Sequence, residues 1–172
     1  MIHTRFSFIL LPLIIIILSG FTLQQDSTEK EKRVLALVIN QIEQNHFAFK
    51  KIDDEFSIQF FNEYLENIDN NKKFLIASDV KRLKKHETFI DDQLLKTNFD
   101  FLNLSIEILN ERITEAEQYY KTILATPFDY TIEEEIETDA QKISFANTKE
   151  ELKDSWRKAL KYQTIIRLQE QL

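Results

Sequence analysis

The chain contains a single glycine, Gly20, and it lies close to the N-terminus. Glycine supplies the positive-φ turns, the phosphate-binding loops and the close backbone approaches from which many catalytic sites are built. The residues after Gly20 also lack cysteine and contain one proline, Pro127. Helices and ordinary turns need none of these residues, whereas disulfides, thiolate sites and glycine-rich loops do. The sequence therefore predicts an all-α scaffold rather than a complete enzyme.

Residues 1–20 have the order of a secretory signal peptide. Arg5 precedes an apolar run at residues 6–18, and small residues follow it. The run is shorter than the roughly 20 apolar residues of a membrane-spanning helix, so cleavage is favoured, with an uncleaved leader that anchors the chain as the alternative. Phe21 stands where a lipoprotein would carry its lipidated cysteine, which excludes lipidation there. The cleavage bond is not fixed, because Leu18 fits the −3 position poorly.

Residues 21–172 are long enough to form one domain with a buried core. Hydrophobic residues make up 43% of the chain and charged residues 30%, which is typical of a globular rather than a disordered protein. The net charge of −7 argues against a nucleic-acid partner, because binding to phosphates needs a patch of Lys and Arg. One short basic cluster exists, and we interpret it as a solvated helix face. Its members are Lys81, Arg82, Lys84 and Lys85.

Apolar side chains at helical spacing predict about five helices after the leader. Asp53 or Asp54 is expected to cap the second helix and Ser78 the third, because their side-chain oxygens can accept from the free N–H groups of a first turn. Thr148 and Glu151 form a capping-box pattern that opens the last helix. The expected helices cover approximately residues 28–49, 54–68, 79–95, 98–125 and 148–172.

Two of these helices carry apolar stripes that we expect to face the core. In the second helix the stripe recurs every four residues, at Phe56, Phe60, Tyr64 and Ile68, and Phe61 and Leu65 widen it. The longest helix is apolar over so much of its circumference that we expect neighbours on more than one flank. Its main stripe comprises Phe99, Leu102, Ile106, Leu109, Ile113 and Tyr120, and Phe101, Leu104, Ile108 and Leu124 widen it.

The segments between the helices are expected to be turns and one longer connector. Asp69, Asn70 and Asn71 form a turn in which asparagine can take the left-handed conformation that glycine usually takes. Residues 74–77 are expected to be short and extended. Residues 128–145 lose the helical periodicity and have higher β propensity, so either a short strand or an irregular connector is expected there.

No residue of the chain is predicted to be catalytic, to bind a cofactor or to bind a metal. His46 and His86 lack a second ligand at a metal-site spacing, and His46 is interpreted as a capping or packing residue. Serine and lysine are frequent enough that a catalytic Ser-Lys pair could be suggested at many positions. No loop that could form an oxyanion hole supports such a pair. An acidic series offers oxygen ligands for a divalent cation, yet calcium loops need a tight turn, so a solvated face or a connector is favoured. The series is Glu133, Glu134, Glu135, Glu137 and Asp139.

The order of segments resembles the N-terminal helical domain of tail-specific proteases, also called carboxy-terminal processing proteases. The resemblance covers approximately residues 34–172, and it departs from the family where a proline often follows the aspartate of the second-helix turn, at Asn70. The matching stretches are His46-Phe47, residues 52–57, residues 60–65, Ile68-Asp69, residues 73–80, residues 127–130 and the helix around Trp156.

This resemblance implies that the chain is part of an exported, periplasmic protease with a serine nucleophile and a lysine general base. It implies a PDZ domain that takes part in recognising the C-terminal tails of substrates. Both the PDZ and the protease domain follow the matched part in the family, so no catalytic residue carries over onto this chain. The last helix reaches Leu172 without a capping residue, which would suit a truncated chain.

The partners implied are those two domains, together with substrate tails or an adaptor protein. Two alternatives stay open from the sequence. The first is a free-standing exported helical adaptor or binding module, and the second is a helical protein tethered to the membrane by its leader.

Overall fold

The structure is a computed structural model that describes residues 29–41 and 51–171. The chain divides into two compact units, residues 1–50 with 94–98 and residues 51–93 with 99–172. In the first unit residues 29–41 form a helix. The predicted leader and the remainder of the predicted first helix lie outside the described residues.

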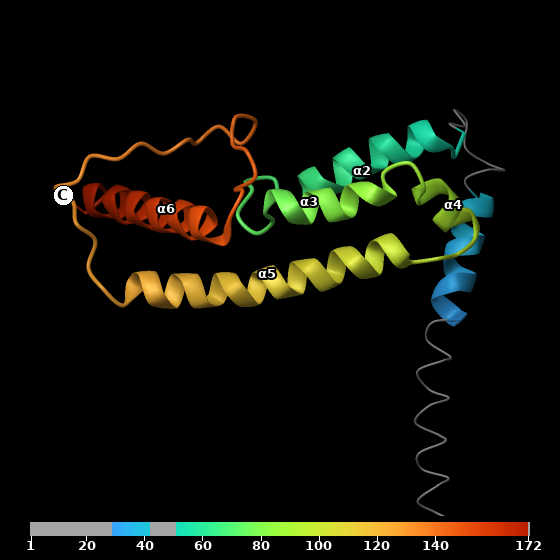
Figure 1. Cartoon of the computed structure of the whole chain (residues 1–172), viewed down its shortest axis with the longest axis horizontal. Coiled ribbons are helices and arrows are strands. Elements are labelled where there is room, and N and C mark those ends of the chain that lie inside the picture. Colours follow the sequence, from blue (N-terminus) through green and yellow to red (C-terminus); the bar gives the residue numbers. More distant parts are fainter. Residues whose placement is uncertain (1–28, 42–50, 172) are drawn as a thin grey trace, which may run out of the picture. The chain divides into compact units, whose positions relative to one another are not determined.

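The described part of the chain is helical and contains no β-strand, which confirms the predicted all-α fold (Figure 1). An isolated parallel β-bridge joins Ile76 to Ala146, and residues 125–147 otherwise form an irregular connector. None of the described helices is long and apolar enough to cross a bilayer. The helices are α2 (Asp54–Ile68), α3 (Ala77–Leu83), the 3-10 turn η1 (Lys84–His86), α4 (Ile90–Leu95), α5 (Asp100–Leu124) and α6 (Lys149–Gln169).

The long helix α5 is the element on which the others of its unit pack. Figure 1 places α2 and α3 beside its N-terminal half and α6 beside its C-terminal half. The Tyr64 hydroxyl of α2 lies 2.6 Å from the Ser105 hydroxyl of α5, and the Tyr64 ring packs edge-on against Phe101. The connector leaves the end of α5 and returns beside α6, so α5 and α6 run in the same direction.

Two helices begin at the capping residues that the sequence predicts. The Asp53 carboxylate accepts the Phe56 N–H at 3.2 Å and starts α2. The Thr148 hydroxyl accepts the Glu151 N–H at 3.1 Å and starts α6. In both cases the side chain satisfies an N–H group that has no carbonyl partner inside the helix.

The start of α3 differs from the prediction. Its first residue is Ala77, and Ile76 occupies the capping position. The Asp79 carboxylate accepts the Ile76 N–H at 3.1 Å, so it closes the first turn from inside the helix. The prediction that Ser78 caps this helix was wrong, because an aspartate one residue later supplies the acceptor.

The third predicted helix is broken into α3, η1 and α4. The break lies between His86 and Ile90. The N–H of Asp91, the second residue of α4, donates to the Ser57 hydroxyl of α2 at 2.8 Å. That hydroxyl in turn donates to the Asp91 carboxylate at 2.8 Å. Since a side chain of another helix takes this N–H, α4 begins as a separate helix. Ser57 is fully buried, and the exchange satisfies its hydroxyl.

Asp69 organises the turn after α2. Its buried carboxylate accepts three backbone N–H groups, from Lys73 at 2.7 Å, Phe74 at 3.1 Å and Leu75 at 2.8 Å. This arrangement places the left-handed residue at Lys72, with φ 49°. The expectation that an asparagine takes that conformation was wrong, because the three bonds to Asp69 decide where the chain reverses.

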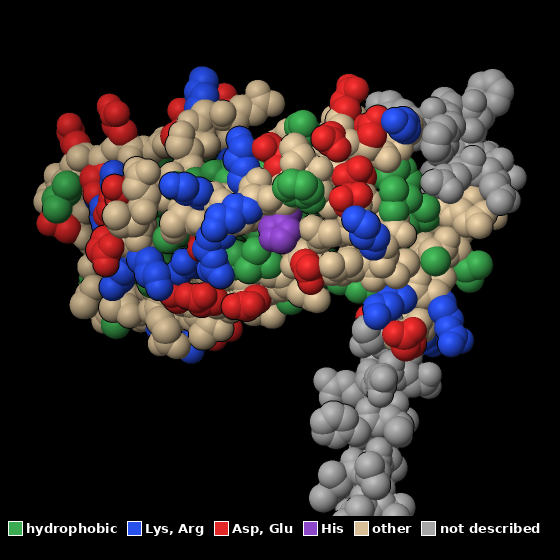
Figure 2. Space-filling view, turned by 45° about the vertical axis from the view of Figure 1, so that its right-hand side comes forward, with side chains coloured by type: hydrophobic (Ala, Val, Ile, Leu, Met, Phe, Trp, Pro, Cys, Tyr) green, Lys and Arg blue, Asp and Glu red, His purple; other side chains and the backbone are tan. Residues whose placement is uncertain are grey.

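Charged side chains of both signs are mixed over the face that Figure 2 shows, with apolar side chains among them. Several residues that the sequence assigned to the core are exposed in the structure. In α2 the buried residues are Ser57 and Phe61, whereas Phe60 is 36% exposed. Phe61 of the predicted stripe is therefore in the core as expected. Phe56, Phe60 and Tyr64 lie at the edge of the buried face and stack on one another.

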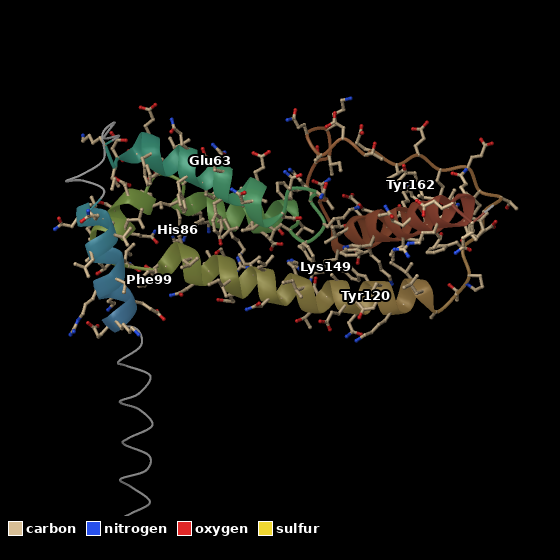
Figure 3. All side chains as sticks on the ribbon, turned by 180° about the vertical axis from the view of Figure 1, so that it is seen from behind. Glu63, His86, Phe99, Tyr120, Lys149 and Tyr162 are labelled. Carbon is tan, nitrogen blue, oxygen red and sulfur yellow. The ribbon has the colours of Figure 1, made fainter. Side chains whose placement is uncertain are left out.

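The buried face of α5 is only partly the predicted one: Phe101 and Ile108 are buried as expected, whereas most of the main stripe is not. Four of its six residues are 39–47% exposed, among them Tyr120 in the C-terminal half of α5 (Figure 3). The buried face includes two polar residues, Ser105 and Arg112, whose polar groups are paired across the interface. When the faces of α5 are ranked by apolar content, the more apolar main stripe beside this buried face is selected instead. The buried residues are Phe101, Ser105, Ile108, Arg112, Ala116 and Ile123.

Two isoleucines on α5 test this assignment. Ile108 is 1% exposed and Ile106 is 47% exposed. We expect Ile108→Ala to lower the free energy of unfolding by about 2–5 kcal/mol, because it leaves a cavity in the core. Ile106→Ala is the matched control and should change it by about 0.5 kcal/mol or less. Urea unfolding followed by circular dichroism measures both, and a larger loss for Ile106→Ala would contradict the assigned face.

Candidate functional site

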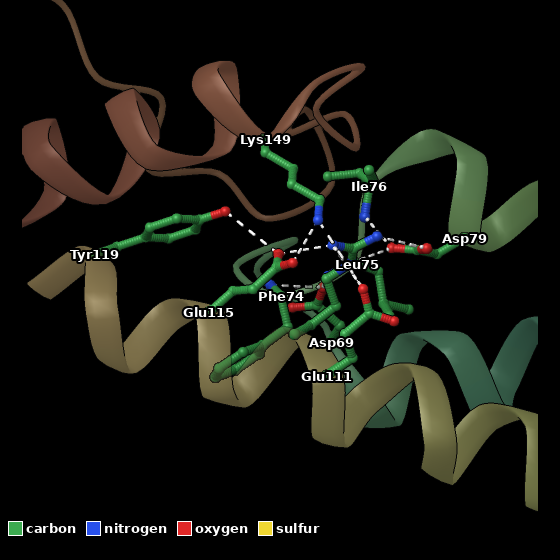
Figure 4. A network of polar contacts seen from close by, with 10 residues as sticks. Asp69, Phe74, Leu75, Ile76, Asp79, Glu111, Glu115, Tyr119 and Lys149 are labelled. Carbon is green, nitrogen blue, oxygen red and sulfur yellow. Dashed lines mark hydrogen bonds and ion pairs between the residues drawn. The ribbon is translucent and has the colours of Figure 1, made fainter.

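The buried face of α5 carries a charged network where it meets α3 and α6 (Figure 4). Arg112 of α5 donates from Nε to Asp79 Oδ2 at 2.7 Å and from Nη2 to Asp79 Oδ1 at 3.0 Å. The Arg112 side chain is 6% exposed and that of Asp79 1%. This two-point geometry suits a planar guanidinium and a carboxylate, and it compensates two charges that would be costly to bury singly.

Glu115 extends the network from α5 to the first residue of α6. It accepts from Arg112 Nη1 at 2.6 Å and from the Lys149 ammonium group, while the Tyr119 hydroxyl lies 3.4 Å away. Although burial opposes the charged form, the hydrogen bonds from Lys149 and Arg112 hold the pKa of Glu115 below its ordinary value. The hydrogen bond to Asp79 raises the pKa of Arg112. Burial and the Glu115 charge raise the pKa of Tyr119.

These charges satisfy one another. Among the described residues, every buried side-chain nitrogen or oxygen has a hydrogen-bond partner. A nucleophile or general base must present an unengaged group to a substrate, and no member of this network does so. The arrangement fixes α3, α5 and α6 to one another.

A second network holds the connector against α6. Glu134 accepts from both terminal nitrogens of Arg157, with Nη1 at 3.0 Å, and from Lys161 Nζ at 2.7 Å. Lys161 is 6% exposed and also donates to the Ile132 carbonyl at 2.9 Å. The hydrogen bonds from Arg157 and Lys161 lower the pKa of Glu134 to about 2. The acidic series lies in the connector, as one of the two interpretations expected. At Glu134 the solvated-face interpretation was wrong, because α6 holds this side chain.

The loop after α2 meets α6 through an aromatic contact and a serine–lysine pair. Trp156 Nε1 donates to the Lys73 carbonyl at 2.7 Å, and the Trp156 ring meets Phe74 edge-on. Lys73 Nζ lies 3.2 Å from the Ser155 hydroxyl, and burial lowers the pKa of Lys73. Ser155 lies inside α6, where backbone N–H groups already bond to carbonyls four residues earlier. No N–H group beside it is free to form an oxyanion hole, so the pair fits a structural role.

Comparison with known proteins places these helices in a family. The model of the tail specific protease N-terminal domain matches residues 38–171. The chain belongs to this family. A tail-specific protease of Haemophilus influenzae is 27% identical over 134 residues, which are 75% of this chain and 19% of that protein. The tail-specific protease N-terminal domain described here thus spans about a fifth of the length of this relative. The resemblance inferred from the order of segments is confirmed.

The histidines and the basic cluster singled out in the sequence can now be placed in this tail-specific protease N-terminal domain. His86 is half-buried, its Nδ1 lies 3.0 Å from Gln93 Nε2, and its ring packs against Phe101. His46 lies outside the described residues. Within the described part of the chain, no group of three or more His, Cys, Asp or Glu could hold a metal ion. The four residues of the basic cluster are exposed, as expected for a solvated face: Lys81, Arg82, Lys84 and Lys85.

Sequence reasoning missed both charged networks. Asp79 and Arg112 are 33 positions apart, and Glu134 and Arg157 are 23 positions apart. One signal was available for the first network, because Arg112 falls at helical spacing from Phe101, Ser105 and Ile108. An arginine in the middle of a helical stripe suggests a buried carboxylate partner on another element. Nothing in the local pattern says which carboxylate it is.

Removal of the arginine tests the first network. We expect Arg112→Met to lower the free energy of unfolding by about 3–5 kcal/mol, because it leaves Asp79 buried without a cation. Lys149→Met, at the exposed end of the same network, is the control and should cost about 0–1 kcal/mol. Urea unfolding at neutral pH gives both values. The double change Asp79→Leu with Arg112→Met should recover part of the loss, and equally small losses for both single variants would contradict a dominant buried pair.

The pH dependence of stability tests the second network. The pKa of Glu134 falls from 4.5 to about 2 on folding, so its stabilising contribution is complete above pH 4.5 and is lost as the pH falls towards 2. The gap in melting temperature between the parent chain and Glu134→Gln should therefore be largest near neutral pH and shrink below pH 4.5. Glu133→Gln, which removes a neighbouring charge, should show a small gap at every pH. A Glu134→Gln gap that stays constant from pH 7 to pH 3 would contradict the ion pair.

Proposed function

We propose that this chain is the non-catalytic N-terminal scaffold of an exported tail-specific serine protease, and that it controls access of substrates to the catalytic part. The observation that carries the proposal is the family match over residues 38–171. The chain corresponds to 19% of the length of the Haemophilus influenzae protease, which supports a role as one part of a longer protein.

The internal organisation of the helices suits such a role. A scaffold must keep its conformation while substrates and other domains bind to it. The buried pair of Arg112 and Asp79, the Asp69 turn and the contact between Trp156 and Lys73 hold the helices at several separate points. Each contact joins segments that are distant in the sequence or fixes a turn. The unit therefore resists local deformation better than helices held by apolar contacts alone.

Export to the periplasm is part of the proposal and is supported by the sequence of residues 1–20. We infer that the leader is cleaved, with an uncleaved membrane anchor as the alternative. The proposed partners are the PDZ and Ser-Lys protease domains of the same longer protein, with substrate C-terminal tails or an adaptor protein as further partners. Neither a cofactor nor a metal is needed for this role.

The size of the natural product tests the proposal. An antibody against residues 51–171 should detect, in the periplasmic fraction of the source cells, a protein well above 20.5 kDa. That larger protein should cleave a peptide with an apolar C-terminal tail, and the chain of residues 21–172 should not. N-terminal sequencing of the product shows whether the leader was removed.

A stable periplasmic product of 20.5 kDa or less would overturn the proposal in favour of a free-standing adaptor. Hydrolysis of the tailed peptide by residues 21–172 alone would overturn its non-catalytic part.

A further inference from the structure

The connector contains a length of open backbone at residues 132–137. These residues form neither helix nor strand, and they run beside α6 (Figure 1). In the part of the chain that the structure describes, the N–H groups of residues 132–137 make no hydrogen bond. Glu134 is exposed as a residue although its side chain is only 18% exposed. The accessible part of this residue is therefore its backbone.

This open backbone is held in place. Glu134 bonds to Arg157 and Lys161, and Lys161 also binds the Ile132 carbonyl. The Tyr130 hydroxyl lies 3.1 Å from the Thr164 hydroxyl of α6. A segment with unpaired N–H groups in a fixed position can accept another strand at a lower entropic cost than a mobile loop. The connector thus resembles the edge of a sheet, although no sheet is present among the described residues.

A hollow lies between this segment and α6. Its volume is about 250 Å³, and the residues that line it include Ile132, Ile136, Ile165 and Tyr162. Sites that enclose small ligands usually measure roughly 300–1,000 Å³, so this open hollow suits side chains of a longer molecule better than a complete small ligand. Ile132 is 55% exposed and Tyr162 38% exposed, which leaves apolar surface for such side chains to cover.

The charge of the segment selects among peptides. Glu133, Glu135 and Glu137 are exposed and form no ion pair with a described residue. The nearby cations Arg157 and Lys161 are engaged by Glu134, and Lys158, which also lines the hollow, pairs with Asp154 at 3.5 Å. The edge therefore presents uncompensated negative charge beside apolar surface. Basic side chains in a partner would be attracted to it, and acidic ones would be repelled.

We propose that residues 132–137 bind an extended peptide in which basic and apolar side chains alternate, and that the peptide adds to this segment as a β-strand. Main-chain hydrogen bonds to the open N–H groups supply affinity, the hollow takes an apolar side chain, and the glutamates select basic ones. The idea that such a peptide is a segment of a protease substrate rests on the proposed function. The binding of the peptide does not rest on the proposed function, so either proposal can fail without the other.

The test is calorimetric titration of residues 21–172 with capped hexapeptides. The probe alternates lysine and valine, and its acetyl and amide ends remove the terminal charges. We expect it to bind, and to bind more weakly as salt is raised, because salt screens the glutamates. A version N-methylated at alternate residues keeps the charge but loses strand hydrogen bonds. We therefore expect its affinity to be lower by about tenfold or more. A peptide that alternates glutamate and valine should not bind.

Variants of the chain locate the site. Glu133→Gln with Glu135→Gln should weaken lysine–valine binding severalfold and reduce its salt dependence. Glu66→Gln with Glu107→Gln removes the same charge from exposed positions on α2 and α5 and should leave binding unchanged. Glu135→Pro, which also removes a backbone N–H, should weaken binding more than Glu135→Ala does. Circular dichroism melting of each variant checks that it is folded.

The proposal is overturned if the lysine–valine peptide does not bind. It is also overturned if the N-methylated version binds equally well, or if both double variants weaken binding equally, since charge alone would then account for the result. None of these outcomes affects the immunoblot that tests membership of a longer protease.

Discussion

The two-point ion pair between Arg112 and Asp79 is the contact on which the rest of the larger unit depends. The same Asp79 carboxylate accepts the Ile76 N–H that begins α3. The next residue, Ala77, donates its N–H to the Ala146 carbonyl at 2.8 Å, close to the start of α6. One buried carboxylate thus connects the start of α3, the middle of α5 and the approach to α6. Because neither charge could stay buried without the other, the position of these elements is set as a group.

The sequence predicted the helices better than the faces they bury. Caps at Asp53 and Thr148 were recognisable because their acceptors act within one turn. The buried face of α5 was only partly predicted, because Ser105 and Arg112 interrupt it and an interpretation by apolar content places polar residues outside. Their partners, Tyr64 and Asp79, lie on other helices, and sequence spacing does not reveal such contacts. The separate start of α4 was missed for the same reason, since the group that binds its first turn belongs to Ser57.

Family membership could be inferred from the sequence, whereas the contacts of the candidate site could not. The resemblance rested on the order of short segments along the chain, and this information is present before folding. The ion pairs of Glu134 depend on where an irregular connector returns beside α6, and no periodicity encodes that path. The acidic series was therefore treated as uniform, although one of its members is held by Arg157 and Lys161 and its neighbours are exposed.

The contact of Trp156 with the loop after α2 has a consequence for spectroscopy. Trp156 is the only tryptophan in the chain, and its indole N–H donates to the Lys73 carbonyl. Tryptophan emission depends on the polarity around the indole ring, so the intrinsic fluorescence of this protein monitors one place, the docking of α6 on that loop. Separation of α6 would change the emission while α2, α3 and α5 stay folded. Fluorescence and circular dichroism therefore follow different events in this molecule, and any difference between their transitions measures how independently α6 opens.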